Sequence, residues 1–276
     1  MRDVVSNGTA AFRRDGAELR AECTSFLGTV VEDAGADGVV VELDGGVESS
    51  AVATVAVEAL GPERVYGLVL PSSKLGSRSA QDAEAIAAAL GIETDTVHLQ
   101  PLLMCFSDTV PEHTDLHGDP IVRAHLVARL RMAITYLAAE ARNRLVVGSV
   151  TRTEFLLGST TKHGDRAADL FPLGGLYSTE VEALGDDLEL PSFVTETPPL
   201  VGQYPGETAK YGIDAPPETV DAVLYGLVED GWTAERTSRE LDIDREIVDR
   251  IARHRRETAR DRREPPMGPV GEAASD

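Results

Sequence analysis

The sequence predicts an α/β protein: a doubly wound parallel sheet flanked by helices, with a helical C-terminal portion. In the first half of the chain, apolar runs typical of buried strands alternate with helical patterns of 10 to 12 residues. Such alternation is typical of βαβ units, whose right-handed crossovers place helices on both faces of a sheet. At 276 residues and 42% hydrophobic content, the chain is long enough to bury one large core.

The expected elements follow one another at short intervals. We expect helices at residues 17–34, 49–60, 80–90 and 120–141, and strands at residues 38–43, 64–70, 94–99 and 144–148. The polar segment 149–175, which contains four glycines, is a candidate site loop. Ligands of open parallel sheets bind beyond the carboxyl ends of the strands, so the turn after strand 38–43 is a second candidate.

Residues 17–266 are expected to form a single α/β domain whose helical portion occupies about residues 216–262. Residues 1–16 are predicted to be flexible, and residues 267–276 to form a disordered tail. The proline-rich segment 191–217 has no clear periodicity, and we interpret it as an ordered connection or a lid.

The formal net charge is −21, and the acidic residues are spread along the whole chain. Only three of the 26 basic residues are lysines. The negative electrostatic field of such a surface disfavours binding to nucleic acid. The composition resembles that of proteins from salt-loving archaea, in which concentrated salt screens self-repulsion. The sequence contains no 18-residue apolar run and no secretory signal, so we expect no membrane association and a cytoplasmic location. Cys23 and Cys105 have apolar neighbours and are expected to be buried thiols.

The apolar strand ending at Leu43 leads into Gly45 and Gly46 and then into a helix of small residues. A turn of this kind aims unpaired backbone N–H groups and the positive end of a helix at one point, which suits a phosphate. Glycines in βα turns also occur for purely steric reasons. The turn therefore indicates a phosphate-binding loop but does not by itself establish one.

Several further blocks recur in the order and spacing of one known family. They are Asp44 to Ser50, Arg129 to Met132, Gly148 to Glu154, Thr161 to Asp165, Asp169 to Pro172 and Arg262 to Pro266. Together they resemble the ammonia-dependent NAD synthetases, which belong to the PP-loop ATP pyrophosphatase superfamily with an adenine nucleotide alpha-hydrolase-like fold. The resemblance covers roughly residues 17 to 266.

The resemblance implies a homodimer that uses ATP to adenylate the nicotinate carboxylate of deamido-NAD. Ammonia then attacks the acyl-adenylate, which gives NAD, AMP and pyrophosphate. Mg²⁺ is the implied cofactor, and Glu48 and Glu154 are the implied metal ligands. Neither cysteine indicates a glutamine-hydrolysing module, so we expect the ammonia to be free or to come from a separate protein.

On the ATP side, the resemblance implies binding roles for Asp44, Gly45, Gly46, Val47, Glu48, Ser49, Ser50, Ser149, Ser178 and Leu200. Four of these differ from the family pattern: Asp44 replaces a serine, Glu48 an aspartate, Ser178 a lysine and Leu200 a hydroxyl residue. A carboxylate about 4 Å from a phosphate charge is repelled by roughly 4 kcal/mol at an effective dielectric constant near 20. ATP binding would be weakened unless a cation bridges the two groups.

On the deamido-NAD side, the implied contacts are Arg129, Lys162, Asp169, Asp261 and Arg262. The first three match the family pattern. At the C-terminal pair, Asp261 replaces a histidine, and Arg262 keeps the charge of a lysine. Arg166 and Ala167 replace a glycine pair, which should stiffen the substrate loop.

Two alternatives remain open at this point. The altered loop is also consistent with a weakened or inactive paralogue that binds nucleotide or regulates an active synthase. Residues 233–248 resemble a helix-turn-helix, although a helix that reads bases would be expected to be more basic than residues 244–249.

Overall fold

Within the described residues, four parallel strands form the sheet, in the spatial order β3-β2-β1-β4. The computed structural model describes residues 14–72, 78–111, 114, 116, 118–195, 213–264 and 266. The strands are β1 (Gly38–Glu42), β2 (Val65–Val69), β3 (Glu93–Thr96) and β4 (Arg144–Val147). Because the chain adds β2 and β3 on one side of β1 and β4 on the other, the predicted doubly wound α/β topology is confirmed.

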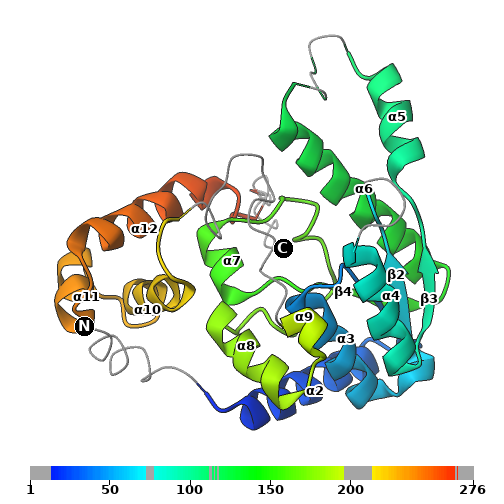
Figure 1. Ribbon diagram of the computed structural model, residues 1–276, viewed down its shortest axis with the longest axis horizontal. Helices are drawn as coiled ribbons and strands as arrows, with labels where there is room; N and C mark the ends of the chain where they lie inside the picture. Colours follow the sequence, from blue (N-terminus) through cyan, green and yellow to red (C-terminus); the bar gives the residue numbers. More distant parts are fainter. Residues whose placement is uncertain are drawn as a thin grey trace, which may run out of the picture.

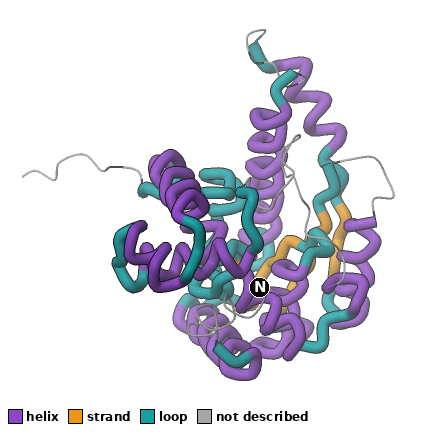
Figure 2. The backbone as a smooth tube through the Cα atoms, turned by 60° about the vertical axis from the view of Figure 1, so that its left-hand side comes forward, coloured by secondary structure: helices purple, strands orange, loops and turns teal. Residues whose placement is uncertain are grey.

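Alternate side chains of β1 point to opposite faces of the sheet, as the period of a strand requires. Val39 and Val41 join the core beneath α2 (Gly16–Asp33), α3 (Val47–Leu60) and α4 (Arg78–Leu90), and α8 (Ser178–Asp187) packs on α2 and α3. Val40 joins the core on the other face, beneath α5 (Gln100–Thr109) and α6 (Pro120–Glu140). Figures 1 and 2 show the strands between these two layers.

β1 lies in the middle of the sheet, where Val40 is in register with Tyr66 of β2 and Val146 of β4. The chain leaves β1 toward α3 and one face of the sheet, whereas β4 is reached from α6 on the other face. The carboxyl ends of β1 and β4 therefore flank the topological switch point, where open α/β sheets form a ligand-binding crevice.

The C-terminal helices build a second core beside the sheet. The helices are α10 (Pro217–Val228), α11 (Ala234–Leu241) and α12 (Arg245–Glu257), followed by the short η3 (Thr258–Arg260). Leu157 of α7 (Arg152–Leu157), Val223 of α10 and Val248 of α12 are each 0% exposed within it. α12 is thereby fixed against α7, which directly follows the carboxyl end of β4 (Figure 1).

All eight helices and strands expected for residues 17–148 are present, with ends shifted by a few residues. Three further helices were missed: α5, α8 and the short α9 (Ser192–Thr195). Part of the expected site loop 149–175 is the helix α7. No helix among the described residues is long and apolar enough to cross a membrane.

The expectation for the cysteines was half wrong, since Cys23 is buried but Cys105 is exposed. Leu103 is the buried residue of α5, and a residue two positions further along a helix points to the opposite side. The predictions for residues 1–13, for Leu200 and for the tail 267–276 lie outside the described part of the chain.

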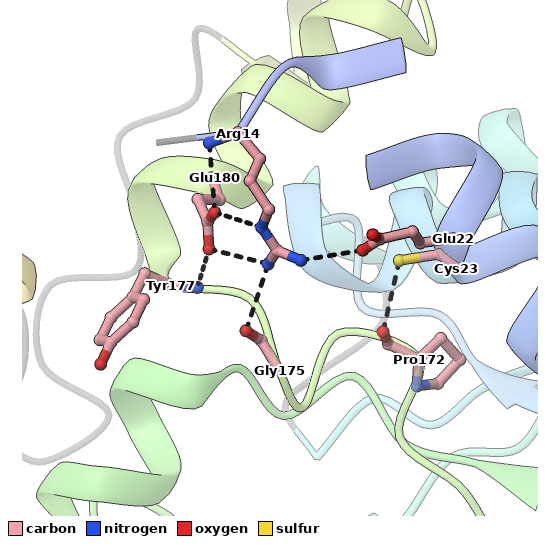
Figure 3. A network of polar contacts seen from close by, with 7 residues as sticks. All are labelled: Arg14, Glu22, Cys23, Pro172, Gly175, Tyr177 and Glu180. Carbon is pink, nitrogen blue, oxygen red and sulfur yellow. Dashed lines mark hydrogen bonds and ion pairs between the residues drawn. The ribbon is translucent and has the colours of Figure 1, made fainter. Parts of the chain in front are cut away.

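Arg14 anchors the chain just before α2 to the start of α8, as Figure 3 shows. Its Nε lies 2.9 Å from Oε1 of Glu180, a carboxylate that is 2% exposed, and its Nη1 lies 2.8 Å from Glu22 Oε2. The second oxygen of Glu180 accepts the backbone N–H of Tyr177 at 2.9 Å. The buried carboxylate is therefore both neutralised and hydrogen-bonded, as a buried charge must be.

Candidate functional site

The turn between β1 and α3 lies at the switch point of the sheet. Gly45 has a φ of +83°, and a Cβ atom built there would lie 2.5 Å from the carbonyl oxygen of Ser79, so only glycine fits. Gly46 is the N-cap of α3, and no side chain caps this helix end. The N–H groups in the first turn of α3 have no partner within the helix, which is the feature that suits a phosphate.

Asp44 folds its carboxylate back into this turn. Its Oδ1 accepts the N–H of Gly46 at 2.8 Å and the hydroxyl of Ser49 at 2.6 Å. Both donors would otherwise be available to an anion. The sequence predicted that Asp44 would repel phosphate; the structure adds that its carboxylate takes up two of the loop's hydrogen-bond donors.

A cavity of about 450 Å³ opens beside the turn, between the carboxyl ends of β1 and β4. It brings together eight of the predicted positions: Asp44, Gly45, Gly46, Val47, Glu48, Ser49, Ser149 and Ser178. Glu154, the second predicted metal ligand, also lines it, whereas Ser50 is fully buried and donates to the carbonyl of Gly46 at 2.7 Å. Helices α6 and α12 supply further walls.

The cavity is rich in carboxylates. Among the described residues, its acidic lining consists of Glu42, Asp44, Glu48, Asp82, Glu154, Asp165 and Glu182. The basic residues of the lining, again among the described residues, are Arg131 and His254. A triphosphate would therefore need added positive charge to bind here, which a divalent cation can supply.

Glu42, the last residue of β1, faces Arg131 of α6, with its Oε1 3.2 Å from the arginine Nε. Removal of the Glu42 carboxyl from water raises its pKa to about 7; Arg131 acts to lower this pKa, and the charges of Asp44 and Asp165 act to raise it. The carboxyl is therefore half-protonated near neutral pH.

Glu154 has a structural role in addition to the predicted metal role. It is the third residue of α7 and forms a capping box with Thr151: its Oε2 accepts the N–H of Thr151 at 2.9 Å, and its own N–H donates to the Thr151 hydroxyl at 3.2 Å. Ser178 begins α8, and its N–H donates to Thr153 at 2.9 Å. The capping networks of α7 and α8 thus hold both residues at the cavity wall.

The predicted deamido-NAD residues lie outside the lining of this cavity. Arg129 and Lys162 are brought together, since the Arg129 guanidinium donates to the carbonyl of Lys162 at 3.3 Å. The Lys162 ammonium in turn donates to the carbonyl of Arg263 at 3.1 Å. These contacts join α6, the loop after α7 and the C-terminal segment.

Asp169 is bonded to β4. Its Oδ2 accepts the N–H of Val146 at 2.7 Å, its own N–H donates back to the Val146 carbonyl at 2.9 Å, and its Oδ1 accepts the hydroxyl of Tyr136 at 3.3 Å. The next residue, Leu170, forms a parallel bridge with Val147. Asp169 therefore has a structural role that the sequence did not indicate.

Asp261 and Arg262 lie at the end of the described C-terminal helices. The Asp261 carbonyl accepts a hydrogen bond from Arg166, and Arg262 Nη1 donates to the Thr258 hydroxyl at 2.7 Å. Burial lowers the pKa of Arg262, and the nearby charges of Arg255 and Arg166 lower it further.

Sequence reasoning did not single out Glu42, Arg131 or His254, which all line the cavity. A signal existed for Glu42, because it is a charged residue at the carboxyl end of an apolar strand. Arg131 falls within a block that carried the family resemblance, but nothing in the local pattern showed that its side chain would meet Glu42. His254 reaches the cavity only because α12 packs on α7.

A doubly wound sheet with a glycine turn and a carboxylate-lined cavity at its switch point defines a nucleotide-binding type of α/β protein. The sequence model of the NAD synthase family matches residues 19–266, and the chain belongs to this family. It is 36% identical to the NH(3)-dependent NAD(+) synthetase of Methanosarcina acetivorans over 243 residues, which cover 88% of this chain and 94% of that one. The NH(3)-dependent NAD(+) synthetase of Halobacterium salinarum is 35% identical, with 85% and 87% covered.

Solved structures of related proteins have the same fold. The NH3-dependent NAD synthetase of Campylobacter jejuni, in complex with a nitrate ion, superposes with a TM-score of 0.76 at 25% identity, covering 93% of this chain and 100% of that one. The NMN synthetase of Francisella tularensis superposes with a TM-score of 0.77 at 25% identity and the same coverage. The fold is thus common to synthetases named for different products.

Proposed function

We propose that the protein is an ammonia-dependent NAD synthetase of the cytoplasm that amidates deamido-NAD at the expense of ATP. The observation that carries this proposal is the convergence of the glycine turn, Glu48, Glu154 and Ser178 on one cavity at the switch point. The extensive similarity to relatives named NH(3)-dependent NAD(+) synthetases supports the same activity.

The turn after β1 would bind the pyrophosphate that leaves when ATP adenylates the substrate. The N–H groups at the start of α3 and the positive end of that helix stabilise negative charge that accumulates on the leaving group. Ser149 and Ser178 line the same cavity and supply hydroxyl donors. For Gly46 and Ser49 to contribute, Asp44 must first release them.

The residues present fit a magnesium ion. Mg²⁺ in nucleotide sites is held by one or two carboxylates together with substrate phosphates and water, and Glu48 and Glu154 both line the cavity as hard oxygen donors. When bound, the ion would neutralise phosphate charge. Glu154 would hold it while its Oε2 keeps the start of α7 capped.

Arg129 and Lys162, together with Asp169, Asp261 and Arg262, are the proposed deamido-NAD side of the site. The contacts of Arg129 with the carbonyl of Lys162, and of Lys162 with the carbonyl of Arg263, place two cations beside the C-terminal segment. Cations at this position suit the diphosphate of a dinucleotide.

The proposed assembly is a homodimer that forms through α5 and α6. Six large apolar side chains on these two helices are exposed: Leu102, Met104, Phe106, Ile121, Val122 and Leu137. α5 and the start of α6 project beyond the sheet in Figures 1 and 2. Apolar surface that gathers in this way on a projecting pair of helices is typical of an interface. Met104→Asp should therefore yield monomers in sedimentation or light-scattering measurements, and an unchanged mass would refute this interface.

The activity is tested with purified protein, deamido-NAD, ATP, Mg²⁺ and ammonium in concentrated KCl. We expect NAD and pyrophosphate to appear in equal amounts, and glutamine to be a poor substitute for ammonium. Identifying the product by mass separates NAD from NMN, which the shared fold does not distinguish. Glu48→Ala should abolish turnover, and Glu84→Ala, on the surface of α4, is the matched control.

Absence of both products while deamido-NAD still binds would refute the proposal and favour a nucleotide-binding paralogue that does not turn over. The family relatives named above offer no support for that alternative. Its basis is the set of altered site residues, and the hydrogen bonds that Asp44 accepts from Gly46 and Ser49 give the most prominent of them a physical explanation.

A further inference from the structure

Three arginine residues meet where the C-terminal segment contacts the loop after α7. Arg166 donates to the carbonyl of Asp261 and, at 3.5 Å, to the carbonyl of Arg262. Arg262 donates in turn to the carbonyl of Arg255 and to the Thr258 hydroxyl. We call Arg166, Arg255 and Arg262 the arginine cluster.

The arginine cluster has unused donors. A guanidinium group carries five N–H bonds, and the contacts above account for two in Arg166 and two in Arg262. The Nε of Arg255 is buried and has no hydrogen-bond partner among the described residues. A buried N–H without an acceptor is costly, and its presence points to a ligand that is not part of the chain.

The charge of the cluster is only partly compensated, since the Arg166 guanidinium stacks on the Phe155 ring at 4.8 Å from its centroid. None of its three guanidinium groups forms an ion pair with a carboxylate in the part of the chain that the structure describes. Repulsion from Arg255 and Arg166 helps to lower the pKa of Arg262, and the nearby Asp261 opposes this only in part. Three like charges packed together in a chain of net charge −21 are unfavourable unless an anion joins them.

The position of the cluster connects it with the cavity. Thr258, which accepts from Arg262, lines the cavity, as does His254, the residue before Arg255. A Cβ atom on Gly158, another lining residue, would lie 3.3 Å from Arg262 Nη1. The cluster therefore lies directly behind the part of the cavity wall that Gly158, His254 and Thr258 form.

We propose that the arginine cluster binds the diphosphate group of a nucleotide substrate. This inference rests on the proposed function for the identity of the ligand. Arginine forks pair with phosphate oxygens through two parallel hydrogen bonds, so three forks can satisfy several oxygens of a diphosphate. Both deamido-NAD and ATP contain a diphosphate group. Measuring the binding of each substrate separately shows which of the two the cluster binds.

The test uses the full-length protein and isothermal titration with three ligands: inorganic pyrophosphate, deamido-NAD and ATP with Mg²⁺. Arg255→Gln and Arg166→Gln should each raise the dissociation constant for pyrophosphate by about tenfold, which is the effect of one lost charged hydrogen bond. Arg253→Gln is the matched control, because Arg253 lies on the same helix with an exposed side chain. Its dissociation constants should remain those of the wild type.

Weakening confined to deamido-NAD assigns the dinucleotide diphosphate to the cluster, and weakening confined to ATP assigns the triphosphate; both support the proposal. Arg166 also ties the C-terminal segment to its loop, so weak binding by its variant must be distinguished from misfolding. The melting temperature provides the check: pyrophosphate should raise it for the wild type and for Arg253→Gln, and much less for Arg255→Gln. Equal dissociation constants for all three variants and the wild type would overturn the proposal.

The outcome is separable from that of the proposed function, since pyrophosphate binding needs no turnover. A wild type that makes no NAD, but whose pyrophosphate affinity depends on Arg255, would refute the synthetase function alone. A wild type that makes NAD, with affinities that no variant changes, would refute the role of the cluster alone.

Discussion

The Ser49 hydroxyl donates to the Asp44 carboxylate at 2.6 Å, so Asp44 occupies a hydrogen-bond donor of the turn after β1, for which we propose phosphate binding. The same carboxylate oxygen also accepts the N–H of Gly46. An incoming phosphate must therefore displace Asp44 from both donors and then tolerate its charge nearby. A magnesium ion or another cation that draws Asp44 outward would make both steps easier.

Replacing Asp44 with serine should lower the KM for ATP by about tenfold or more, because it removes a repulsion of up to roughly 4 kcal/mol and frees two donors. Steady-state kinetics at fixed deamido-NAD and ammonium measure the change. Asp186→Ser, at an exposed position of α8, is the control and should leave the KM unaltered. A KM for ATP that is the same in Asp44→Ser and the wild type would mean that Asp44 does not obstruct the site.

Glu154→Gln separates the capping role of this residue from its proposed metal role. A glutamine can still accept the N–H of Thr151, so the melting temperature should stay close to that of the wild type. The uncharged side chain is a poor Mg²⁺ ligand, so half-saturation by Mg²⁺ should need about tenfold more metal. Glu154→Ala should lose about 1 kcal/mol of stability as well. An unaltered Mg²⁺ dependence in Glu154→Gln would assign Glu154 to capping alone.

Glu42 should make the protein less stable as the pH rises from about 4.5 to 7. Its pKa in the folded protein is about 7, above the ordinary value of 4.5, so in this window the folded state binds more protons than the unfolded chain. The unfolding free energy then falls with increasing pH. Relative to Glu42→Gln, the wild type should lose roughly 1–2 kcal/mol between pH 5 and 8, less than the full shift implies because the side chain is 29% exposed. Urea unfolding at both pH values measures the difference, and parallel pH profiles would contradict it.

Removing Arg14 should destabilise the protein by about 2 kcal/mol, because Glu180 is 2% exposed and would be left without its cation. Arg14→Met combined with Glu180→Gln should recover part of the loss, which chemical unfolding can measure. Arg20→Met is the control: Arg20 lies on α2, and its partners Glu58 and Asp187 are each 28% exposed, so the expected cost is below about 1 kcal/mol. Equal losses in Arg14→Met and Arg20→Met would argue against a special role for the buried carboxylate.

The net charge of −21 leads us to expect that the melting temperature rises steadily between dilute buffer and about 2 M KCl. Differential scanning fluorimetry across a KCl series measures it. A flat profile would mean that the acidic surface does not limit stability.

The strands and the turn after β1 could be predicted from the sequence because each depends on local patterns. Apolar runs and flanking glycines mark β1 and β4, and the turn follows directly from Gly45 and Gly46. The start of α3 was predicted at Ser49, two residues too late. The structure shows that Gly46 is the N-cap, so the helix begins at Val47. α8 was missed because its sequence is rich in acidic and small residues, and its burial depends on packing against α2 and α3. The single domain spanning residues 17–266 stays a prediction.

The site was harder to predict than the fold, since its walls come from segments far apart in the chain. Periodicity can place Arg131 on α6 and His254 on α12, but it cannot show that both reach one cavity. The carboxylate of Asp44 was recognised as an obstacle from its charge alone. Its hydrogen bonds to Gly46 and Ser49 depend on the backbone of the turn, and only the three-dimensional structure reveals them.

The hydrogen bonds between Asp169 and Val146 cover the outer side of β4, an edge strand of the sheet. Within the described chain, β4 is the last strand on its side, and an outermost strand with open N–H and carbonyl groups can recruit strands from other molecules. Asp169 occupies both the N–H and the carbonyl of Val146, and Leu170 accepts the N–H of Gly148 at 3.0 Å. A substitution at Asp169 would thus leave the Val146 N–H without its acceptor on this outermost strand, so it would weaken the protection against aggregation as well as any contact with substrate.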